Sequence, residues 1–292
     1  MTSVIHGYPT SRSNGPEARS VLRPAAAREP GDVTIHIWKP REGIMPAVFV
    51  HGNPETTAVW DDLLPYLGGV DVILLSPPGF GAPVPDRFGA TVNEYGEWLA
   101  AELARISGPI DLVGHDWGGA YVLRIAMQRP ELIRSWSTDC AGVFDPQYVW
   151  HDLAQIWQTP GAGEQQVAQQ VSMTTEARAL RYESLGMSRQ VSAKVSAGYD
   201  QAMGRCILAV YRSAAQPALA TWGRELERAA ARPGLVLVAT EDHFVGGEAM
   251  ARRSAARCGA KIAVLQGVGH WWMCQDPKRG AAALTEFWAN LA

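Results

Sequence analysis

The chain has 292 residues, of which 47% are hydrophobic and 19% are charged, so it can form one large α/β domain with an insertion or two small domains. Its formal net charge of −3 and the absence of a basic run argue against a nucleic-acid partner. No apolar stretch approaches the roughly 18 residues of a membrane helix, and the four cysteines lack the spacing of a disulfide framework or a zinc site.

The beginning of the chain is predicted to be an N-terminal arm over residues 1–31, because it is rich in Pro, Ser, Arg and Ala. Residues 1–10 lack the charged and apolar regions of a secretory signal, so we expect a cytoplasmic protein. Residues 33–38 alternate between apolar and polar side chains, as a half-buried strand does. Residues 47–50 form a continuous apolar run, which is typical of a strand covered on both faces.

Further segments predict strands that alternate with helical patterns. These segments cover residues 71–75, 110–113, 133–138, 235–238 and 261–265. Helices are predicted over residues 92–106, where apolar side chains fall on one face, and over residues 281–291. The alternation indicates an α/β fold with a mostly parallel central sheet flanked by helices, in which functional residues lie in loops at the carboxyl ends of the strands.

Strand signals vanish between about residues 144 and 225, where Trp, Gln, Met and Ala occur in helical segments. We interpret residues 144–225 as a helical cap inserted into a core domain made of residues 32–143 and 226–292. Such a cap would shape a substrate pocket and exclude bulk water from it.

The segment Leu112-Val113-Gly114-His115-Asp116-Trp117-Gly118-Gly119 predicts a strand, a sharp turn and a helix. Gly114 and Gly118 have the spacing of the G-x-S-x-G nucleophile elbow, and Asp116 stands where the serine would be. A nucleophile on so tight a turn leaves no room for side chains beside it. A carboxylate with an ordinary pKa of about 3.9 is ionised at neutral pH, so Asp116 can attack saturated carbon and form an ester that water must then cleave. The alternative is that Asp116 only caps the following helix.

Two further residues suit the second half of that reaction. His270 lies in a glycine-rich loop after the last strand, where it can act as the general base that activates water. A third group must hold the tautomer and orientation of this base. Asp242, after the penultimate strand, is our choice because it follows the nucleophile and precedes the histidine. Its neighbour Glu241 and Asp139, at the end of the strand after the elbow helix, are the alternatives.

Ester hydrolysis develops an oxyanion on Asp116, which needs hydrogen-bond donors. We expect the backbone N–H of Trp117 and one N–H from the loop 51–53 to supply them. The side chains of Asn53 and Trp117 are donors as well, and they could hold a halide or polarise a substrate. The alternative is that Trp117 only packs and Asn53 only shapes a turn.

At these residues the chain resembles the aspartate-nucleophile branch of the α/β-hydrolase fold family, which contains epoxide hydrolases and haloalkane dehalogenases. The GHDWGG elbow at 114–119 fits both activities. The segment 51–56, HGNPET, is similar to the HGxPE(S/T) loop of epoxide hydrolases, and 269–271 is similar to their GHW. Tyr211, in the segment 210–213, resembles the lid tyrosine that donates a proton to the epoxide oxygen. The resemblance implies a mostly parallel sheet with an inserted helical cap, and neither a cofactor nor a metal.

The sequence departs from this pattern at two places. Epoxide hydrolases usually have a second lid tyrosine, but Ile156 stands at its position with Trp157 beside it, so Trp157 or Tyr148 would be the second donor. Asn53 together with Trp117 resembles the halide-binding pair of many haloalkane dehalogenases. We also expect substrate contacts from His51 in the same loop as Asn53.

The sequence therefore favours a hydrolase with an aspartate nucleophile, and an epoxide hydrolase that forms a diol in particular. The alternatives are a haloalkane dehalogenase, an esterase or lactonase, and a ligand-binding protein without catalysis on the same fold. The eleven tryptophans favour a small apolar or aromatic substrate. We expect no nucleic-acid or membrane partner, and the sequence gives no indication of the oligomeric state.

Overall fold

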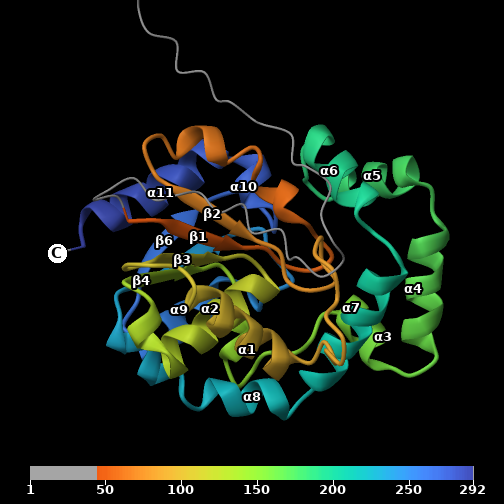
Figure 1. Cartoon of the computed structure of the whole chain (residues 1–292), viewed down its shortest axis with the longest axis horizontal. Coiled ribbons are helices and arrows are strands. Elements are labelled where there is room, and N and C mark those ends of the chain that lie inside the picture. Colours follow the sequence, from red (N-terminus) through yellow and green to blue (C-terminus); the bar gives the residue numbers. More distant parts are fainter. Residues whose placement is uncertain (1–44, 292) are drawn as a thin grey trace, which may run out of the picture. The chain divides into compact units, whose positions relative to one another are not determined.

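Six parallel strands form the central sheet of the computed structural model, which describes residues 45–291 (Figure 1). The strands are β1 (Ala47–Val50), β2 (Val72–Leu75), β3 (Asp111–Gly114), β4 (Ser135–Thr138), β5 (Gly234–Ala239) and β6 (Lys261–Leu265). Their order across the sheet is β2-β1-β3-β4-β5-β6. The predicted parallel α/β architecture is confirmed, while the predicted arm 1–31 and the predicted strand 33–38 lie outside the described residues.

The strands β1 and β5 are buried at every position, which explains their uninterrupted apolar sequences. Along β1, Val48 and Val50 point into one hydrophobic core, whereas Ala47 and Phe49 point into the other. Alternate side chains of a strand point to opposite faces, so a strand between two cores needs apolar residues at every position.

Helices cover both faces of the sheet (Figure 1). The helices α1 (Val92–Leu103), α2 (Trp117–Gln128) and α9 (Gly247–Arg257) pack on one face, and α10 (Trp272–Gln275) and α11 (Pro277–Ala289) pack on the other. A capping box of Thr91 and Glu94 starts α1. This helix ends at Leu103, three residues earlier than predicted, and the last helix starts at Pro277, four residues earlier than predicted.

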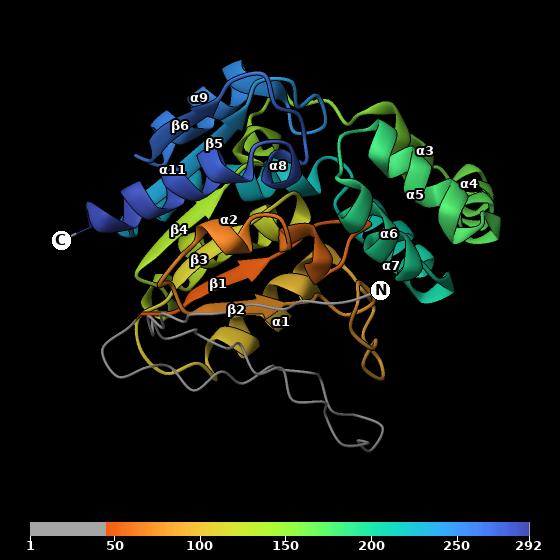
Figure 2. The same cartoon turned by 90° about the horizontal axis from the view of Figure 1, so that it is seen from above.

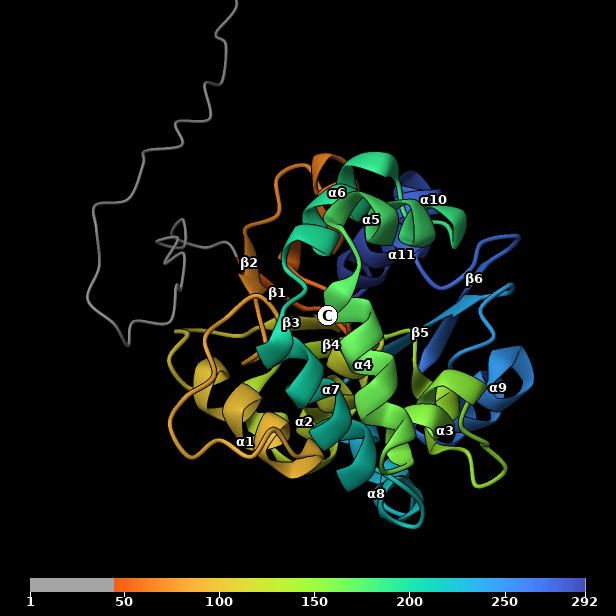
Figure 3. The same cartoon turned by 90° about the vertical axis from the view of Figure 1, so that its right-hand side faces the viewer.

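A group of helices lies beyond the carboxyl ends of the strands (Figures 2 and 3). These are α3 (Asp152–Gln158), α4 (Ala162–Ser172), α5 (Thr175–Ser184), α6 (Arg189–Ala197) and α7 (Gln201–Ser213), called the cap helices below. The next helix, α8 (Ala218–Gly223), packs instead against the short 3₁₀ helix Ala141–Phe144. The cap boundaries 144 and 225 stay a prediction.

The remaining helical turns are 3₁₀ helices: Thr57–Trp60, Leu64–Tyr66, Pro130–Leu132 and Leu226–Ala231. Within residues 45–291 no helix has both the length and the apolar character that a bilayer crossing requires.

Candidate active site

Asp116 occupies a strained turn between β3 and α2. Its backbone has φ 49° and ψ −123°, a conformation that costs a non-glycine residue about 1–3 kcal/mol. The Asp116 N–H donates to Asp139 Oδ1 at 3.0 Å. A Cβ on Gly118 would lie 2.2 Å from the carbonyl oxygen of Val50, and one on Gly114 would lie 2.5 Å from the carbonyl oxygen of Gly118. The elbow therefore needs both glycines, as its spacing predicts.

The Asp116 carboxylate faces the pocket instead of its own helix. It makes no capping bond to α2, so the alternative that it only caps that helix is wrong. Its Oδ1 accepts a hydrogen bond of 2.9 Å from the Asn53 N–H, and a Cβ on Gly52 would lie 2.3 Å from the Asp116 Cβ. Because Gly52 has no side chain, the loop after β1 can approach Asp116 closely, and the Asn53 N–H can donate to the Asp116 carboxylate.

His270 lies between two carboxylates. Its Nδ1 is 2.8 Å from Asp242 Oδ2, and its Nε2 is 3.8 Å from Asp116 Oδ2. Asp242 is itself held by the Phe244 N–H, which donates to Oδ1 at 2.8 Å. This arrangement places the proton on Nδ1 and turns Nε2 toward the Asp116 carboxylate. The partner of His270 is Asp242, and the neighbouring Glu241 is exposed.

Asp139, the other candidate partner of His270, belongs to a different pair. Its Oδ2 is 2.5 Å from His115 Nδ1 and accepts the Trp272 indole N–H at 2.7 Å. Its Oδ1 accepts the backbone N–H of the strained residue Asp116, so Asp139 stabilises the turn of the elbow. Sequence position alone does not separate Asp139 from Asp242, because both follow strands whose carboxyl ends meet at this edge of the sheet.

Glu55 completes a buried charge network beneath the elbow. It accepts hydrogen bonds from His115 Nε2 at 3.1 Å, from the Trp271 indole N–H at 2.5 Å and from the Gly52 N–H at 3.0 Å. Burial opposes the His115 cation, but the Asp139 and Glu55 carboxylates outweigh it and raise the pKa of His115 well above its usual value. Burial likewise opposes the Glu55 anion, yet His115 lowers the pKa of Glu55 to about 2.

The same network accounts for a group of potential metal ligands. Among the described residues, Glu55, His115 and His270 offer ligand atoms within 4.8 Å of one another. Both nitrogens of His115 already bond carboxylates, and a protonated imidazole cannot bind a metal. The donor set therefore fits an ion-pair network and not a metal centre.

The charges of Asp116 and His270 depend on each other. Burial raises the pKa of Asp116 to about 6, against the opposing effect of the His270 and His115 cations. Burial lowers the pKa of His270, but Asp242 and Asp116 counteract this and leave its pKa above the usual value. Esterification of Asp116 would remove one of the negative charges that hold a proton on His270. The pKa of His270 would then fall, because Asp116 is one of the two carboxylates that raise it.

We expect Asp116→Asn to stabilise the protein. The pKa of Asp116 is raised from 3.8 to about 6 in the folded chain, so ionisation destabilises the fold above pH 6, by about 1–3 kcal/mol. This penalty shrinks as the pH falls from 6 and is gone below about 3.8, where the folded and the unfolded chain are both protonated. Urea unfolding at pH 7.5 and pH 4.5 measures the difference. The exposed Asp86→Asn is the control, and a variant no more stable than the native chain at pH 7.5 contradicts the raised pKa.

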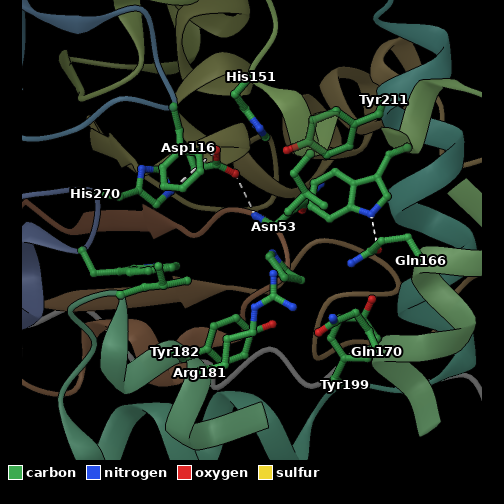
Figure 4. A pocket seen from close by; sticks show the side chains of 16 residues that line it. Asn53, Asp116, His151, Gln166, Gln170, Arg181, Tyr182, Tyr199, Tyr211 and His270 are labelled. Carbon is green, nitrogen blue, oxygen red and sulfur yellow. Dashed lines mark hydrogen bonds and ion pairs between the residues drawn. The ribbon is translucent and has the colours of Figure 1, made fainter. Parts of the chain in front are cut away.

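The Asp116 carboxylate lines a pocket between the core and the cap helices (Figure 4). About 610 Å³ of empty space, part of it open to solvent, is enclosed by aromatic and polar side chains. Tyr211 on α7 is 2% exposed. Burial and then the charge of Asp116 raise the pKa of Tyr211 well above its usual value, so the phenol keeps its proton. Figure 4 shows the Tyr211 hydroxyl pointing toward the space in front of Asp116.

A comparison with known families now adds to this geometry. The model of the alpha/beta hydrolase family matches residues 47–283. The chain belongs to the alpha/beta hydrolase family. Among curated proteins it is similar to (E)-2-((N-methylformamido)methylene)succinate hydrolase of Acinetobacter baylyi, with 26% identity over 103 residues. That match covers 35% of this chain and spans 39% of the length of the relative.

Solved structures of other alpha/beta hydrolases share the fold. Haloalkane dehalogenase DbeA from Bradyrhizobium elkani is 24% identical with a TM-score of 0.63, and the match covers 85% of this chain and 92% of that one. A serine hydrolase involved in carbazole degradation, the CarC enzyme, is 18% identical with a TM-score of 0.62, covering 84% and 91%. One of these neighbours is a dehalogenase and the other a serine hydrolase, so the likeness establishes the fold and leaves the chemistry to the residues of the site.

His151 is a pocket residue of this alpha/beta hydrolase that the sequence analysis missed. Its Nδ1 accepts the Ala154 N–H at 3.2 Å at the start of α3. Burial lowers the pKa of His151 to about 4, so the ring is neutral and carries its proton on Nε2. Figure 4 shows the ring pointing toward the space between Asp116 and Tyr211. A histidine between Trp150 and Asp152, within the predicted helical cap, is the only signal in the sequence.

Of the three predicted substrate contacts His51, Tyr148 and Trp157, Trp157 lines the main pocket and the other two do not. His51 is fully buried, its Nδ1 lies 2.9 Å from the Gly52 carbonyl oxygen, and it does not line the pocket. The Tyr148 hydroxyl donates to the Phe244 carbonyl oxygen at 2.8 Å, and Tyr148 lines only a smaller adjacent pocket. Trp157 does line the main pocket, but its indole N–H donates to Gln166 Oε1 at 2.5 Å. Neither Tyr148 nor Trp157 therefore offers a free second donor.

Asn53 and Trp117 differ in their surroundings. The Asn53 side chain is 6% exposed, lines the main pocket, and has no partner for either its nitrogen or its oxygen among the described residues. The Trp117 ring packs against Trp150 and Tyr211, and it lines the smaller pocket on the other side of Asp116. Asn53 is thus available to a ligand, whereas Trp117 mainly supports the neighbouring aromatic rings.

Proposed function

We propose that this alpha/beta hydrolase is an epoxide hydrolase with Asp116 as its nucleophile. The observation that carries the proposal is a buried carboxylate 3.8 Å from His270 Nε2, in a pocket that also receives the protonated phenol of Tyr211. A carboxylate attacks carbon, a phenol protonates the oxygen that leaves, and an imidazole activates water.

The first step opens the ring. An oxygen of Asp116 forms a bond to one epoxide carbon, and the bond from that carbon to the epoxide oxygen breaks. The electron pair stays on the oxygen, which takes the proton of the Tyr211 hydroxyl. The Nε2–H of His151 can hydrogen-bond the same oxygen, so His151 replaces the second tyrosine that the sequence lacks. Because the pKa of Tyr211 is raised, the resulting tyrosinate regains a proton from water.

The second step cleaves the ester. His270 Nε2 takes a proton from water, and the water oxygen attacks the ester carbonyl carbon of Asp116. The Asn53 N–H, which contacts the carboxylate already, can stabilise the oxyanion that forms. The intermediate then collapses, and the diol leaves with the proton returned by His270. Asp116 is left as a carboxylic acid, and its proton neutralises the hydroxide formed when Tyr211 regained a proton from water, so Asp116 is a carboxylate again. Asp242 holds the imidazole and stabilises its cation throughout.

A haloalkane dehalogenase is the second candidate. The unpaired amide of Asn53 could bind a halide beside Asp116. Halide leaves without a proton, so this reaction needs Asp116 and His270 but does not need the Tyr211 hydroxyl. The aspartate at the elbow argues against an esterase with a serine nucleophile.

We expect Tyr211→Phe to separate the two candidates. The variant should lose at least about 100-fold in kcat for epoxides and change little for haloalkanes, because only epoxide opening needs a proton. Activity against a panel of terminal and aryl epoxides and a panel of primary haloalkanes measures this. The exposed Tyr66→Phe is the control. Turnover of haloalkanes alone would replace the epoxide proposal with the dehalogenase, and no turnover of either panel would overturn both.

A further inference from the structure

Three hydrogen-bond donors gather at the end of the pocket away from Asp116 (Figure 4). Gln170 comes from α4, Arg181 from α5, and Tyr199 from the connection between α6 and α7. We call these three residues the distal cluster. They come from three separate segments of the chain, and all of them line the same cavity as the nucleophile.

The side-chain donors of the distal cluster find no hydrogen-bond partner within residues 45–291. Gln170 is 5% exposed and its Nε2 is unpartnered there, and Tyr199 is 7% exposed and so is its hydroxyl. The exposed Arg181 lies at the mouth of the pocket, and its guanidinium makes no hydrogen bond or ion pair in the part of the chain that the structure describes. Buried polar groups normally find a partner, so the cluster is complete only when something else supplies an acceptor.

A neighbouring arginine shows that packing of the cap does not require Arg181. The Arg178 guanidinium is buried and donates to the carbonyl oxygens of Gln170, Met173 and Ser196. It ties α4, α5 and the end of α6 together. Arg181, one turn later on α5, is left free to face the pocket.

The chemistry of the distal cluster fits a carboxylate. A guanidinium only donates, and its planar geometry matches the two oxygens of a carboxylate. An amide nitrogen and a phenol beside it can donate to the same oxygens. The pocket is also polarised, because Asp116 is the one carboxylate and Arg181 the one guanidinium among the described residues that line it. A substrate with one anionic end is repelled from Asp116 and drawn to Arg181.

From this placement we propose that the pocket selects electrophiles with a carboxylate at one end, which Arg181, Gln170 and Tyr199 bind while the reacting carbon lies against Asp116. Apolar residues that also line the pocket, such as Leu153, Phe244 and Leu185, accommodate the carbon chain. The part that concerns the reacting carbon rests on the proposed function, and the binding of the carboxylate does not. The sequence favours a small apolar or aromatic substrate, and the proposal changes this to a substrate with an apolar chain and a carboxylate at one end.

Calorimetric binding of hexanoate and of its neutral amide, hexanamide, at pH 8 tests the distal cluster without any reaction. We expect hexanoate to bind about 10-fold more tightly than hexanamide, as a charged hydrogen bond at a partly exposed site allows. Arg181→Gln should abolish that preference. Arg189→Gln, which removes an exposed arginine of α6 outside the pocket, should keep it. Equal binding of acid and amide by the native chain, or no binding of hexanoate, overturns the proposal.

A second experiment tests whether the distal cluster also affects the reaction. It compares the terminal epoxide of hexenoic acid with that of its primary amide. In His270→Gln, mass spectrometry should show the acid alkylating Asp116 about 10-fold faster than the amide at sub-saturating concentration. Adding Arg181→Gln should remove that difference, and adding Arg189→Gln should not.

If the cluster binds hexanoate but neither epoxide alkylates Asp116, the proposed function fails and the carboxylate site stands. If both epoxides alkylate Asp116 at equal rates, the carboxylate selection fails and the proposed function stands.

Discussion

His270→Gln is expected to trap the first substrate molecule on Asp116 as a stable ester. The attack of Asp116 needs no base, but hydrolysis of the ester does, and Nε2 of His270 lies 3.8 Å from the carboxylate. We expect turnover to fall by about 1,000-fold or more, while one substrate molecule adds per chain. Mass spectrometry of the intact protein and of the peptide that contains Asp116 measures the adduct.

The exposed His243→Gln is a matched control, because it removes an imidazole from the same region without touching the pocket. It should turn over at the native rate and accumulate no adduct. Asp242→Asn should lie between the two, since it leaves the base in place but removes the carboxylate that orients it. An adduct on any residue other than Asp116, or native turnover in His270→Gln, contradicts the mechanism.

Gly118→Ala is expected to destabilise the whole domain. The added Cβ would lie 2.2 Å from the carbonyl oxygen of Val50 and 2.7 Å from that of His51. Both atoms belong to the backbone at the end of β1, so the clash is relieved only if α2 moves away from the sheet. We expect a loss of about 3 kcal/mol or more in the free energy of unfolding, together with loss of activity, because the same shift displaces Asp116.

Gly68→Ala provides the control for this substitution. Gly68 is exposed, and a Cβ there would meet no heavy atom within 4 Å. Urea unfolding of both variants measures the difference in stability. If Gly118→Ala unfolds at the same urea concentration as Gly68→Ala, the close approach of α2 to β1 is not a requirement of the elbow.

The central sheet and the elbow were predictable because their signals are local. Residues 47–50 and 235–238 have no polar interruptions, since both faces of those strands are buried. Gly114 is required by a close contact within the turn, and Gly118 is required by the β1 backbone beside it, so the spacing of the two glycines carries the information. The positions of Asp116, Asp242 and His270 follow from one rule about the carboxyl ends of parallel strands.

The lining of the cap was not predictable in the same way. Gln170 and Arg181 lie on helices whose exposed faces contain similar residues, and no periodicity tells a side chain that faces a pocket from one that faces solvent. Tyr148 and Trp157 are plausible donors by residue type. Their hydroxyl and indole N–H groups are already used by the Phe244 carbonyl and the Gln166 side chain, and these contacts depend on how the chain packs. Asp139 and Asp242 could be separated only by contacts made across the sheet.

The distal cluster and the Asp116–His270–Asp242 group lie in different stretches of the chain. Gln170, Arg181 and Tyr199 fall within one uninterrupted portion of the chain, whereas Asp116, Asp242 and His270 sit on three loops outside it. His151, before α3, and Tyr211, on α7, belong to that same portion between β4 and β5. Exchanging it for its counterpart from another family member would therefore replace the proposed proton donor together with the carboxylate site, whereas Asp116, Asp242 and His270 would keep their supports.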